Sequence, residues 1–235
     1  MIKRVLLKIS GEALLCKDGK PIDQNFLSYL SKEIKNIYDN GIEIAVVVGG
    51  GNIFRGLNAN RDTGLDRVTG DYMGMLGTVI NSLALKAAFE ANGMPSRAMT
   101  AIEIPKVAEP FIRGRAIRHL EKKRIVIFGA GTGNPYFTTD TAAALRAAEI
   151  GAELLIKATR VDGLYDKDPE KNKDAVMIEK TTYRDAISRK LRVMDMTALS
   201  LCEENNLNLR ILNIFKEGNI FKAIKGDNIG SLVTN

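Results

Sequence analysis

Three glycine-rich turns, each directly after an apolar and strand-like run, have the composition of a phosphate-binding site. They occupy residues 8–11, 49–52 and 129–134. Glycine lets backbone N–H groups approach an anion closely, and a helix that follows such a turn adds the partial positive charge of its N-terminus. A single turn of this kind can be only a tight turn, but three in one chain favour a polyphosphate site.

Two lysines add positive charge to these turns. Lys8 stands at the end of the first apolar run, just before Ser10 and Gly11, and Lys157 ends a later run in the same way. Because ligands bind beyond the carboxyl ends of the strands in open α/β sheets, both lysines could straddle a transferring phosphoryl group. Asp140 could cap a helix, hold the two lysines through charge-assisted hydrogen bonds, or do both.

Three further residues have chemistry to consider. Arg55 follows the second turn, and its guanidinium could bind phosphate through two hydrogen bonds. We expect Asp71 to begin a long helix, either as its cap or as an acceptor for ribose hydroxyl groups. His119 is the only histidine and lies in a basic stretch, so we expect it at the surface and not in a catalytic triad.

Two common nucleotide-binding motifs are absent. The P-loop pattern G-x-x-x-x-G-K-S/T does not occur, and the dinucleotide pattern G-x-G-x-x-G fails at Phe54 and Asn134. A Walker-type NTPase and an NAD dehydrogenase are therefore not supported. The chemistry that remains is phosphoryl transfer, which needs positioning, cations and Mg²⁺ more than it needs a base.

Length and composition are those of an ordinary α/β enzyme. The 235 residues are 45% hydrophobic and 26% charged, which is enough for a substantial core. Cys16 and Cys202 imply no disulfide framework, and the chain enters a strand at once, so we expect a cytoplasmic protein without a leader. No apolar run reaches the roughly 18–20 residues that span a bilayer, so no membrane association is expected.

The net charge of +6 raises the question of an anionic partner. The densest basic run, residues 113–124, contains no aromatic residues and has an apolar side at Ala116, Ile117 and Leu120. This pattern favours the solvated face of a helix over a nucleic-acid surface. An anionic effector, bound at an interface between subunits, is the alternative for this run.

Strand-like and helix-like patterns alternate along the whole chain, which predicts a mostly parallel sheet with helices on both faces. Strands are expected over residues 5–7, 44–48, 96–101, 125–128, 153–157 and 209–214 and near 232. Helices are expected over residues 23–40, 71–92, 113–124, 138–150, 183–188 and 195–206. Asp162-Gly163 has the composition of a hairpin turn.

The long helix over residues 71–92 should bury one stripe of apolar side chains. These are Met75, Leu76, Val79, Ile80 and Leu83. Its small residues, Gly74, Gly77 and Ser82, indicate close packing, here against a helix of a second subunit. The chain as a whole is expected to form one domain of two lobes that share the sheet, with the boundary near residue 150.

Six segments together resemble the bacterial uridylate kinases, a family within the amino acid kinase superfamily. They are residues 8–13, 49–56, 70–76, 131–140, 157–163 and 193–195. The resemblance covers nearly the full length of the chain. The first two segments and Lys157 are general to the superfamily, whereas the Asp71 helix and residues 132–139 are typical of uridylate kinases.

This resemblance implies a three-layer αβα sandwich and the ATP-dependent phosphorylation of UMP to UDP, with Mg²⁺, in pyrimidine biosynthesis. Residues 1–150 would form the UMP-binding lobe and residues 151–235 the ATP-binding lobe. Lys8, Lys157 and Arg55 would stabilise the transferring phosphoryl group, with Asp140 orienting the lysines. The family is typically a cytoplasmic homohexamer that UTP inhibits and that GTP activates in many members.

The resemblance also implies two sets of ligands. Those for ATP are Lys8, Ile9, Ser10, Gly11, Gly51, Arg55, Thr159, Tyr165 and Asp168. Those for UMP are Gly50, Asp71, Thr132, Gly133, Asn134, Pro135, Tyr136, Phe137, Thr138 and Thr139. No metal ligands are implied, because Mg²⁺ can be held mainly by ATP phosphates and water.

The chain departs from the family in two places. Lys20-Pro21 stands where GTP-responsive members often have Phe-Gly, which leaves GTP activation open. Tyr136 replaces the commoner phenylalanine and adds a hydroxyl near the substrate segment. Two other functions stay open from the residues alone: a kinase of this fold with another acceptor, and a non-catalytic nucleotide-binding regulator. A regulator would be expected to lose the lysines or Asp140, and this chain keeps them.

Overall fold

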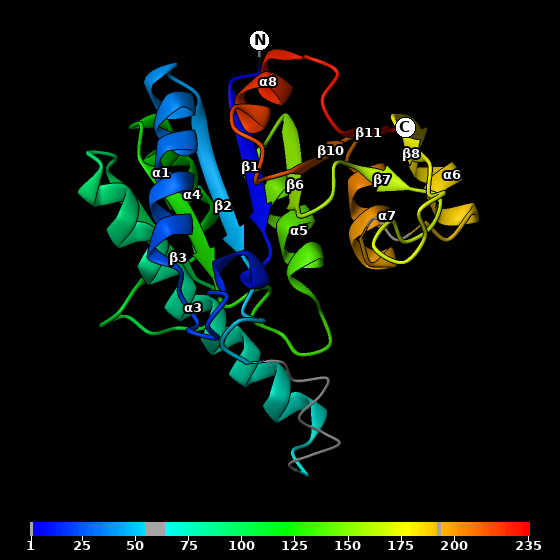
Figure 1. Cartoon of the computed structure of the whole chain (residues 1–235). Helices are drawn as coiled ribbons and strands as arrows, with labels where there is room; N and C mark the ends of the chain where they lie inside the picture. The colour runs from blue at the N-terminus through cyan, green and yellow to red at the C-terminus, as the bar shows by residue number, and fades with distance from the viewer. Residues whose placement is uncertain (1, 55–63, 192–193) are drawn as a thin grey trace.

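A nine-stranded sheet forms the centre of the computed structural model, which describes residues 2–54, 64–191 and 194–235 (Figure 1). The strand order is β4-β3-β5-β2-β1-β6-β10-β11-β9. The strands are β1 (Arg4–Ile9), β2 (Glu43–Val48), β3 (Ser96–Thr100), β4 (Glu109–Pro110), β5 (Ile125–Gly129), β6 (Leu154–Thr159), β9 (Lys180–Thr182), β10 (Asn208–Asn213) and β11 (Ser231–Thr234). Of these pairings only that of β10 with β11 is antiparallel.

Helices cover both faces of this sheet and give three layers. One face carries α1 (Gln24–Asp39), α3 (Arg67–Ala91) and α8 (Asn219–Lys225). The other carries α4 (Arg113–Glu121), α5 (Thr139–Ile150), α6 (Tyr183–Ser188) and α7 (Met196–Glu204). Side chains of β1 alternate between the faces, because successive residues of a strand point to opposite sides. The predicted αβα sandwich is confirmed.

Two of the predicted helix starts are confirmed by their caps. The Asp23 side chain accepts hydrogen bonds from the backbone N–H groups of Asn25 and Phe26 at the start of α1. The Thr138 side chain accepts from Asp140 and Thr141 at the start of α5. Such caps satisfy N–H groups that have no partner within the helix. Asp140 therefore lies in the first turn of α5 and is not its cap.

The start of α3 differs from the prediction. The helix begins at Arg67, and Asp66 caps it by accepting a hydrogen bond from the backbone N–H of Thr69. Asp71 is therefore inside the helix and does not cap it. The sequence contains two acidic residues five positions apart, and only the first has the extended backbone of a cap.

The buried face of α3 also differs from the prediction. Met75 and Val79 are buried, but Leu76 and Ile80 are 48% and 47% exposed. The face turned to the sheet instead consists largely of small and polar residues, because it lies against the glycine turns at the strand ends. Its residues include Gly77, Thr78, Asn81 and Ser82. An apolar stripe on this helix therefore did not identify the face that packs on the sheet.

The predicted hairpin turn at Asp162-Gly163 is wrong. The hairpin in this region consists of β7 (Leu164–Tyr165) and β8 (Met177–Ile178), joined across residues 166–176. Gly163 instead lies against β11, since a side chain there would meet the Ser231 hydroxyl at 2.5 Å. The Ser231 hydroxyl accepts a hydrogen bond from the backbone N–H of Leu164, which fixes β7 to the main sheet.

The chain reverses its direction across the sheet at β1. After β1 the chain forms β2, β3, β4 and β5 on one side, and then crosses through α5 to β6 and β10 on the other. Such a reversal leaves a crevice at the carboxyl ends of the two strands that flank it, here β1 and β6. The carboxyl ends of these strands carry Lys8 and Lys157.

Candidate functional site

Two lysines and one carboxylate meet at this reversal. Lys8 and Lys157 are direct neighbours in the register of β1 and β6. The Lys8 Nζ atom lies 2.6 Å from Asp140 Oδ1, and the Lys157 Nζ atom lies 2.8 Å from Asp140 Oδ2. Only 10–17% of each of the three side chains is exposed. The structure thus brings together the three residues for which the sequence predicted a common place.

The charges of this cluster shift its pKa values. Burial alone would raise the pKa of Asp140, but the two ammonium groups outweigh burial and hold the pKa below its ordinary value. Burial lowers the pKa of Lys157; Asp140 opposes that shift and Lys8 adds to it. The two lysines therefore favour the ionised form of Asp140, and the cluster contains two basic groups to one acidic group.

The first and second glycine turns lie against one another beside this cluster. A side chain at Gly11 would meet the Asn52 Oδ1 atom at 2.6 Å and the Gly51 N atom at 2.7 Å. A side chain at Gly50 would meet the Gly74 O atom of α3 at 2.5 Å. Glycine is required at both positions, since no Cβ atom fits there. The turns can therefore present backbone N–H groups at one edge of the sheet.

A pocket of about 140 Å³ lies between these turns and α3. Most of the predicted UMP ligands line it: Gly50, Asp71, Thr132, Asn134, Phe137, Thr138 and Thr139. Gly51, predicted as an ATP ligand, also lines this pocket. Gly133, Pro135 and Tyr136 are not among its lining residues. Tyr136 instead donates its backbone N–H to Asp71 Oδ2 at 2.7 Å, and the residue is 64% exposed.

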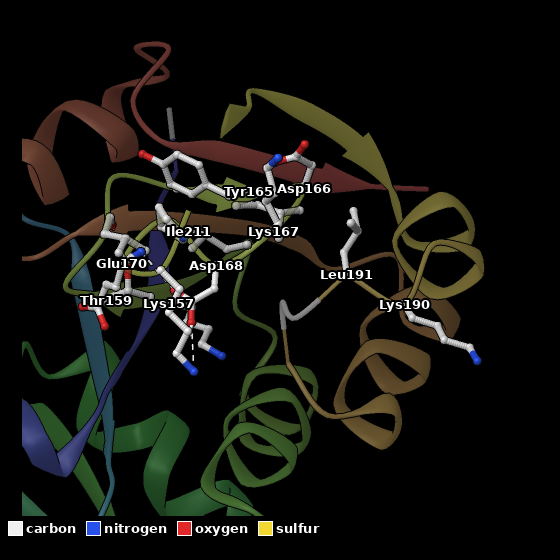
Figure 2. Close-up of a pocket in the computed structure, with 15 residues that line it drawn as sticks. Lys157, Thr159, Tyr165, Asp166, Lys167, Asp168, Glu170, Lys190, Leu191 and Ile211 are labelled. Carbon is white, nitrogen blue, oxygen red and sulfur yellow. Dashed lines mark hydrogen bonds and ion pairs between the residues drawn. The ribbon is translucent and has the colours of Figure 1, made fainter. Parts of the chain in front are cut away.

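Two pockets lie on the other side of the lysines. The nearer one, of about 260 Å³, is lined by Lys8, Ser10, Lys157 and Thr159 among others. The larger one, of about 600 Å³, shares Lys157 and Thr159 with it and contains the predicted ATP ligands Tyr165 and Asp168 (Figure 2). The two lysines thus stand between a small pocket next to α3 and a larger one next to β7.

The remaining predicted ATP ligands have different surroundings. Ile9 is fully buried in β1, so only its backbone could reach a ligand. Gly11 presents backbone against the second turn, as described above. Arg55 lies outside the residues that the structure describes.

Comparison with known proteins identifies the family to which this chain belongs. The sequence matches the amino acid kinase family over residues 3–213. A relative from Arabidopsis thaliana, described as the chloroplastic uridylate kinase PUMPKIN, is 53% identical over 231 residues, which are 98% of this chain and 68% of the relative. The chain belongs to the amino acid kinase family.

Solved structures point to one branch of that family. The UMP kinase from Bacillus anthracis superposes with a TM-score of 0.96 at 41% identity, over 99% of this chain and 96% of that one. The UMP kinase from Ureaplasma parvum gives 0.93 at 37% identity over the whole of both chains. The resemblance to uridylate kinases that the sequence motifs indicated is confirmed.

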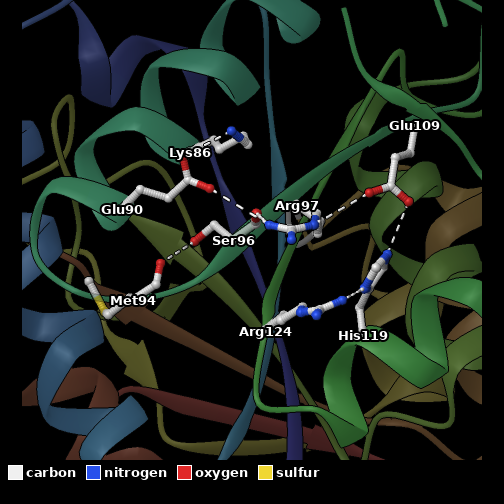
Figure 3. Close-up of polar contacts among 8 residues, drawn as sticks. All are labelled: Lys86, Glu90, Met94, Ser96, Arg97, Glu109, His119 and Arg124. Atoms are coloured by element: carbon white, nitrogen blue, oxygen red, sulfur yellow. Dashed lines mark hydrogen bonds and ion pairs between the residues drawn. The ribbon is translucent and has the colours of Figure 1, made fainter.

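The only histidine of the kinase is buried, against the prediction of a surface position. His119 Nε2 lies 3.0 Å from Glu109 Oε2, and Nδ1 lies 3.2 Å from a guanidinium nitrogen of Arg124 (Figure 3). Arg97 also approaches Glu109, at 3.5 Å. No sequence pattern predicts β4, which brings Glu109 next to α4, and so His119 had no expected partner. Most of the basic run, from Arg113 to Lys123, is exposed as predicted.

Several polar residues that support the site of the kinase were not singled out from the sequence. Asp195 caps α7 and accepts a hydrogen bond from the Thr141 hydroxyl at 2.9 Å and another from Thr138, so it holds the start of α5. The Thr78 hydroxyl accepts from the backbone N–H of Ala130 at 2.7 Å. Asp195 stood in a matching segment, but no pattern marked Thr78, because a buried polar residue in a helix depends on what faces it.

Proposed function

We propose that this kinase transfers the γ-phosphoryl group of ATP to UMP and forms UDP, a step of de novo pyrimidine nucleotide synthesis. One observation carries the proposal: Lys8 and Lys157, held by Asp140, stand between the pocket next to α3 and the pockets next to β6 and β7. The names of the relatives, uridylate kinase and UMP kinase, support UMP as the acceptor.

The proposed reaction needs no general base. A phosphomonoester has a second pKa of about 6, so most of the attacking UMP phosphate is already a dianion at neutral pH. Its oxygen attacks the γ-phosphorus, the bond to the bridging oxygen of ADP breaks, and no proton has to move. The barrier comes from bringing two polyanions together, and Lys8 and Lys157 lower it by stabilising the transferring group.

We assign the ligands on the basis of pocket and motif together. The first turn and Arg55 would bind ATP phosphates, and Thr159, Tyr165 and Asp168 would line the adenine-nucleotide pocket. Asp71 would accept from ribose hydroxyls of UMP, and residues 132–139 would surround the uridine. In this assignment residues 1–150 hold UMP and residues 151–235 hold ATP.

Mg²⁺ fits this site as an ion carried by ATP. Among the residues that the structure describes, no three or more His, Cys, Asp or Glu side chains come together as possible ligands. Mg²⁺ commonly keeps several waters and binds through substrate phosphates, so a protein cage is not needed. When bound, the ion neutralises charge on the ATP phosphates. Asp140 is engaged by two lysines and would orient them.

Assembly and regulation are also part of the proposal. We expect a cytoplasmic homohexamer that UTP inhibits, and GTP activation is open because of Lys20-Pro21. Four apolar residues on the outer side of α3, Tyr72, Met73, Leu76 and Ile80, are 38–48% exposed and support contact with a second copy. In the part of the chain that is described, no helix is long and apolar enough to cross a membrane.

A coupled assay with MgATP tests the proposal. UMP, CMP, dTMP, acetylglutamate and carbamate are offered in turn, with GTP or UTP added to parallel reactions. Turnover confined to UMP is expected. Turnover of another acceptor would support the alternative of a different substrate, and tight nucleotide binding without any turnover would support a regulator. Salt-sensitive retention on DNA would revive a nucleic-acid role for the basic run.

A further inference from the structure

We propose that the side chains of Asn52 and Asn81 form an amide pair that positions the second glycine turn for phosphoryl transfer. Asn81 Nδ2 donates to Asn52 Oδ1 at 2.7 Å, and Asn52 Nδ2 donates back to Asn81 Oδ1 at 3.0 Å. The Asn81 amide also donates to the Gly49 carbonyl at 2.7 Å. The inference deepens the proposed function, on which it rests.

The pair connects three separate segments of the chain. Asn81 belongs to α3, and Asn52 is the residue that follows the three glycines of the turn. The remaining N–H of the Asn52 amide donates to the Pro21 carbonyl at 2.6 Å, in the loop before α1. Both N–H groups of each amide are thus used within the protein, so the pair acts through the backbone and not by touching a substrate.

The amide pair holds the turn from the side of α3, while the Gly49 N–H donates to the Ile9 carbonyl of β1 at 2.9 Å. The three glycines of residues 49–51 have no side chains that could pack. The position of this turn sets the distance between the first glycine turn and α3. A Cβ atom added at Gly11 would lie 2.7 Å from the Gly49 O and Gly51 N atoms, and one added at Gly50 would lie 2.5 Å from the Gly74 O atom of α3. A displaced turn would therefore move the first turn and the α3 pocket relative to one another.

Burial makes the pair sensitive to a single-atom change. Asn81 is 0% exposed, and the atoms that face its amide nitrogen are both acceptors, the Gly49 carbonyl and Asn52 Oδ1. In Asn81→Asp an oxygen replaces that nitrogen and faces both acceptors. The ionised carboxyl cannot donate, whereas the protonated carboxyl can donate one O–H. Lower pH should therefore restore part of the contact.

Three variants with the same single-atom change test the inference: Asn81→Asp, Asn52→Asp and the control Asn92→Asp. Asn92 lies at the other end of α3, where its amide donates to the Ala88 carbonyl at 2.8 Å. For each variant we measure kcat with UMP and MgATP across pH, the UMP-binding stoichiometry and the melting temperature. The stoichiometry gives the folded fraction, so kcat is expressed per competent site.

At neutral pH we expect Asn81→Asp to lose roughly 10²-fold in kcat per UMP-binding site, the effect of about 1 Å of misplacement. The ratio of its kcat to that of wild type should rise as the pH falls. Asn52→Asp should lose activity and recover in the same way, because its replaced nitrogen also faces two acceptors, the Pro21 carbonyl and Asn81 Oδ1. Asn92→Asp should match wild type. A kcat per site equal to wild type, or a ratio independent of pH, would overturn the inference. Absence of UMP turnover by the wild-type chain would instead overturn the proposed function.

Discussion

Lys8, Lys157 and Asp140 form the charged cluster on which the proposed phosphoryl transfer depends. Each lysine occupies a strand position that points toward α5, where the neighbouring positions are apolar. Two ammonium groups that close would repel one another, and the carboxylate between them relieves this repulsion. With two lysines to one carboxylate, the cluster is suited to attract a polyanion.

The Lys8 ammonium is expected to act on the transition state. Replacement by alanine should lower kcat by at least roughly 10²-fold, since removal of one preorganised donor costs about 2.7–4 kcal/mol. The melting temperature should change little, because Asp140 keeps Lys157 as a partner. Steady-state assays with UMP and MgATP measure the effect. Lys3→Ala, next to the same strand and with a 69% exposed side chain, is the control and should retain full activity. A kcat near that of wild type would remove Lys8 from the mechanism.

Asp140→Asn should move the alkaline limb of the kcat profile to lower pH. In the proposed mechanism a protonated Lys157 stabilises the phosphoryl group, and burial already lowers the pKa of this lysine against the opposing Asp140. Without the carboxylate the pKa of Lys157 should fall further, so activity should decline at lower pH than in wild type. The measurement is kcat at saturating substrates across the alkaline range.

Asp185→Asn makes the same change in the first turn of α6 and provides the control for that profile. Its alkaline limb should coincide with that of wild type. Identical limbs for Asp140→Asn and wild type would mean that Asp140 does not tune Lys157.

Among the elements, α3 lines the pocket beside the glycine turns, and its buried face was predicted poorly. Its C-terminal end and its apolar residues were clear from the sequence, but its buried face contains Thr78, Asn81 and Ser82. Hydrophobic periodicity identifies the face that packs on apolar surface, and here the surface is glycine backbone. Buried polar residues of this kind become recognisable only when their partners are known.

Other elements followed from local rules. Alternating apolar strands and capped helices predicted most of the fold, including α6 with its observed bounds. The two-residue strand β4 has no such pattern, and strand order depends on contacts distant in the sequence. The strand-end lysines could be predicted as a pair, because the carboxyl ends of neighbouring parallel strands share one edge of the sheet. The Asn52–Asn81 pair and the burial of His119 could not be predicted, because both depend on contacts between residues distant in the sequence.

Gly50→Ala tests the packing of the second turn on α3. The added methyl group would meet the Gly74 carbonyl at 2.5 Å, so turn and helix must separate. Overpacking costs about 1–3 kcal/mol, and the separation should also weaken UMP binding in the α3 pocket. We expect a lower melting temperature and a higher Kd for UMP by calorimetry.

Gly114→Ala is the control for that substitution. A methyl group there has no heavy atom within 4 Å, and in the helix α4 it should stabilise by roughly 0.5–1 kcal/mol. An unchanged Kd for UMP in Gly50→Ala would contradict the close fit of turn and helix.

The two sides of α3 differ in the residues that they carry and in the roles that we propose for them. The inner side of α3 supports the site, and the outer side carries the exposed apolar residues Tyr72, Leu76 and Ile80 at a spacing of four. That spacing places them in one row on the helix. A contiguous apolar row of this kind is typical of an interface. If a second copy of the chain covers this row, then α3 contributes both to the candidate site and to the contact between subunits.

The double variant Leu76→Glu/Ile80→Glu is therefore expected to dissociate the assembly. Closed oligomers of identical chains commonly meet through the same patch on both subunits, so the new charges would face one another across the interface. Sedimentation velocity should show a smaller species than the wild-type oligomer, while nucleotide binding persists because the inner side of α3 is unchanged. Val176→Glu, at a 63% exposed apolar residue far along the chain, should leave the assembly intact. A monomeric wild-type chain, or a double variant that sediments like wild type, would mean that this side of α3 does not hold the subunits together.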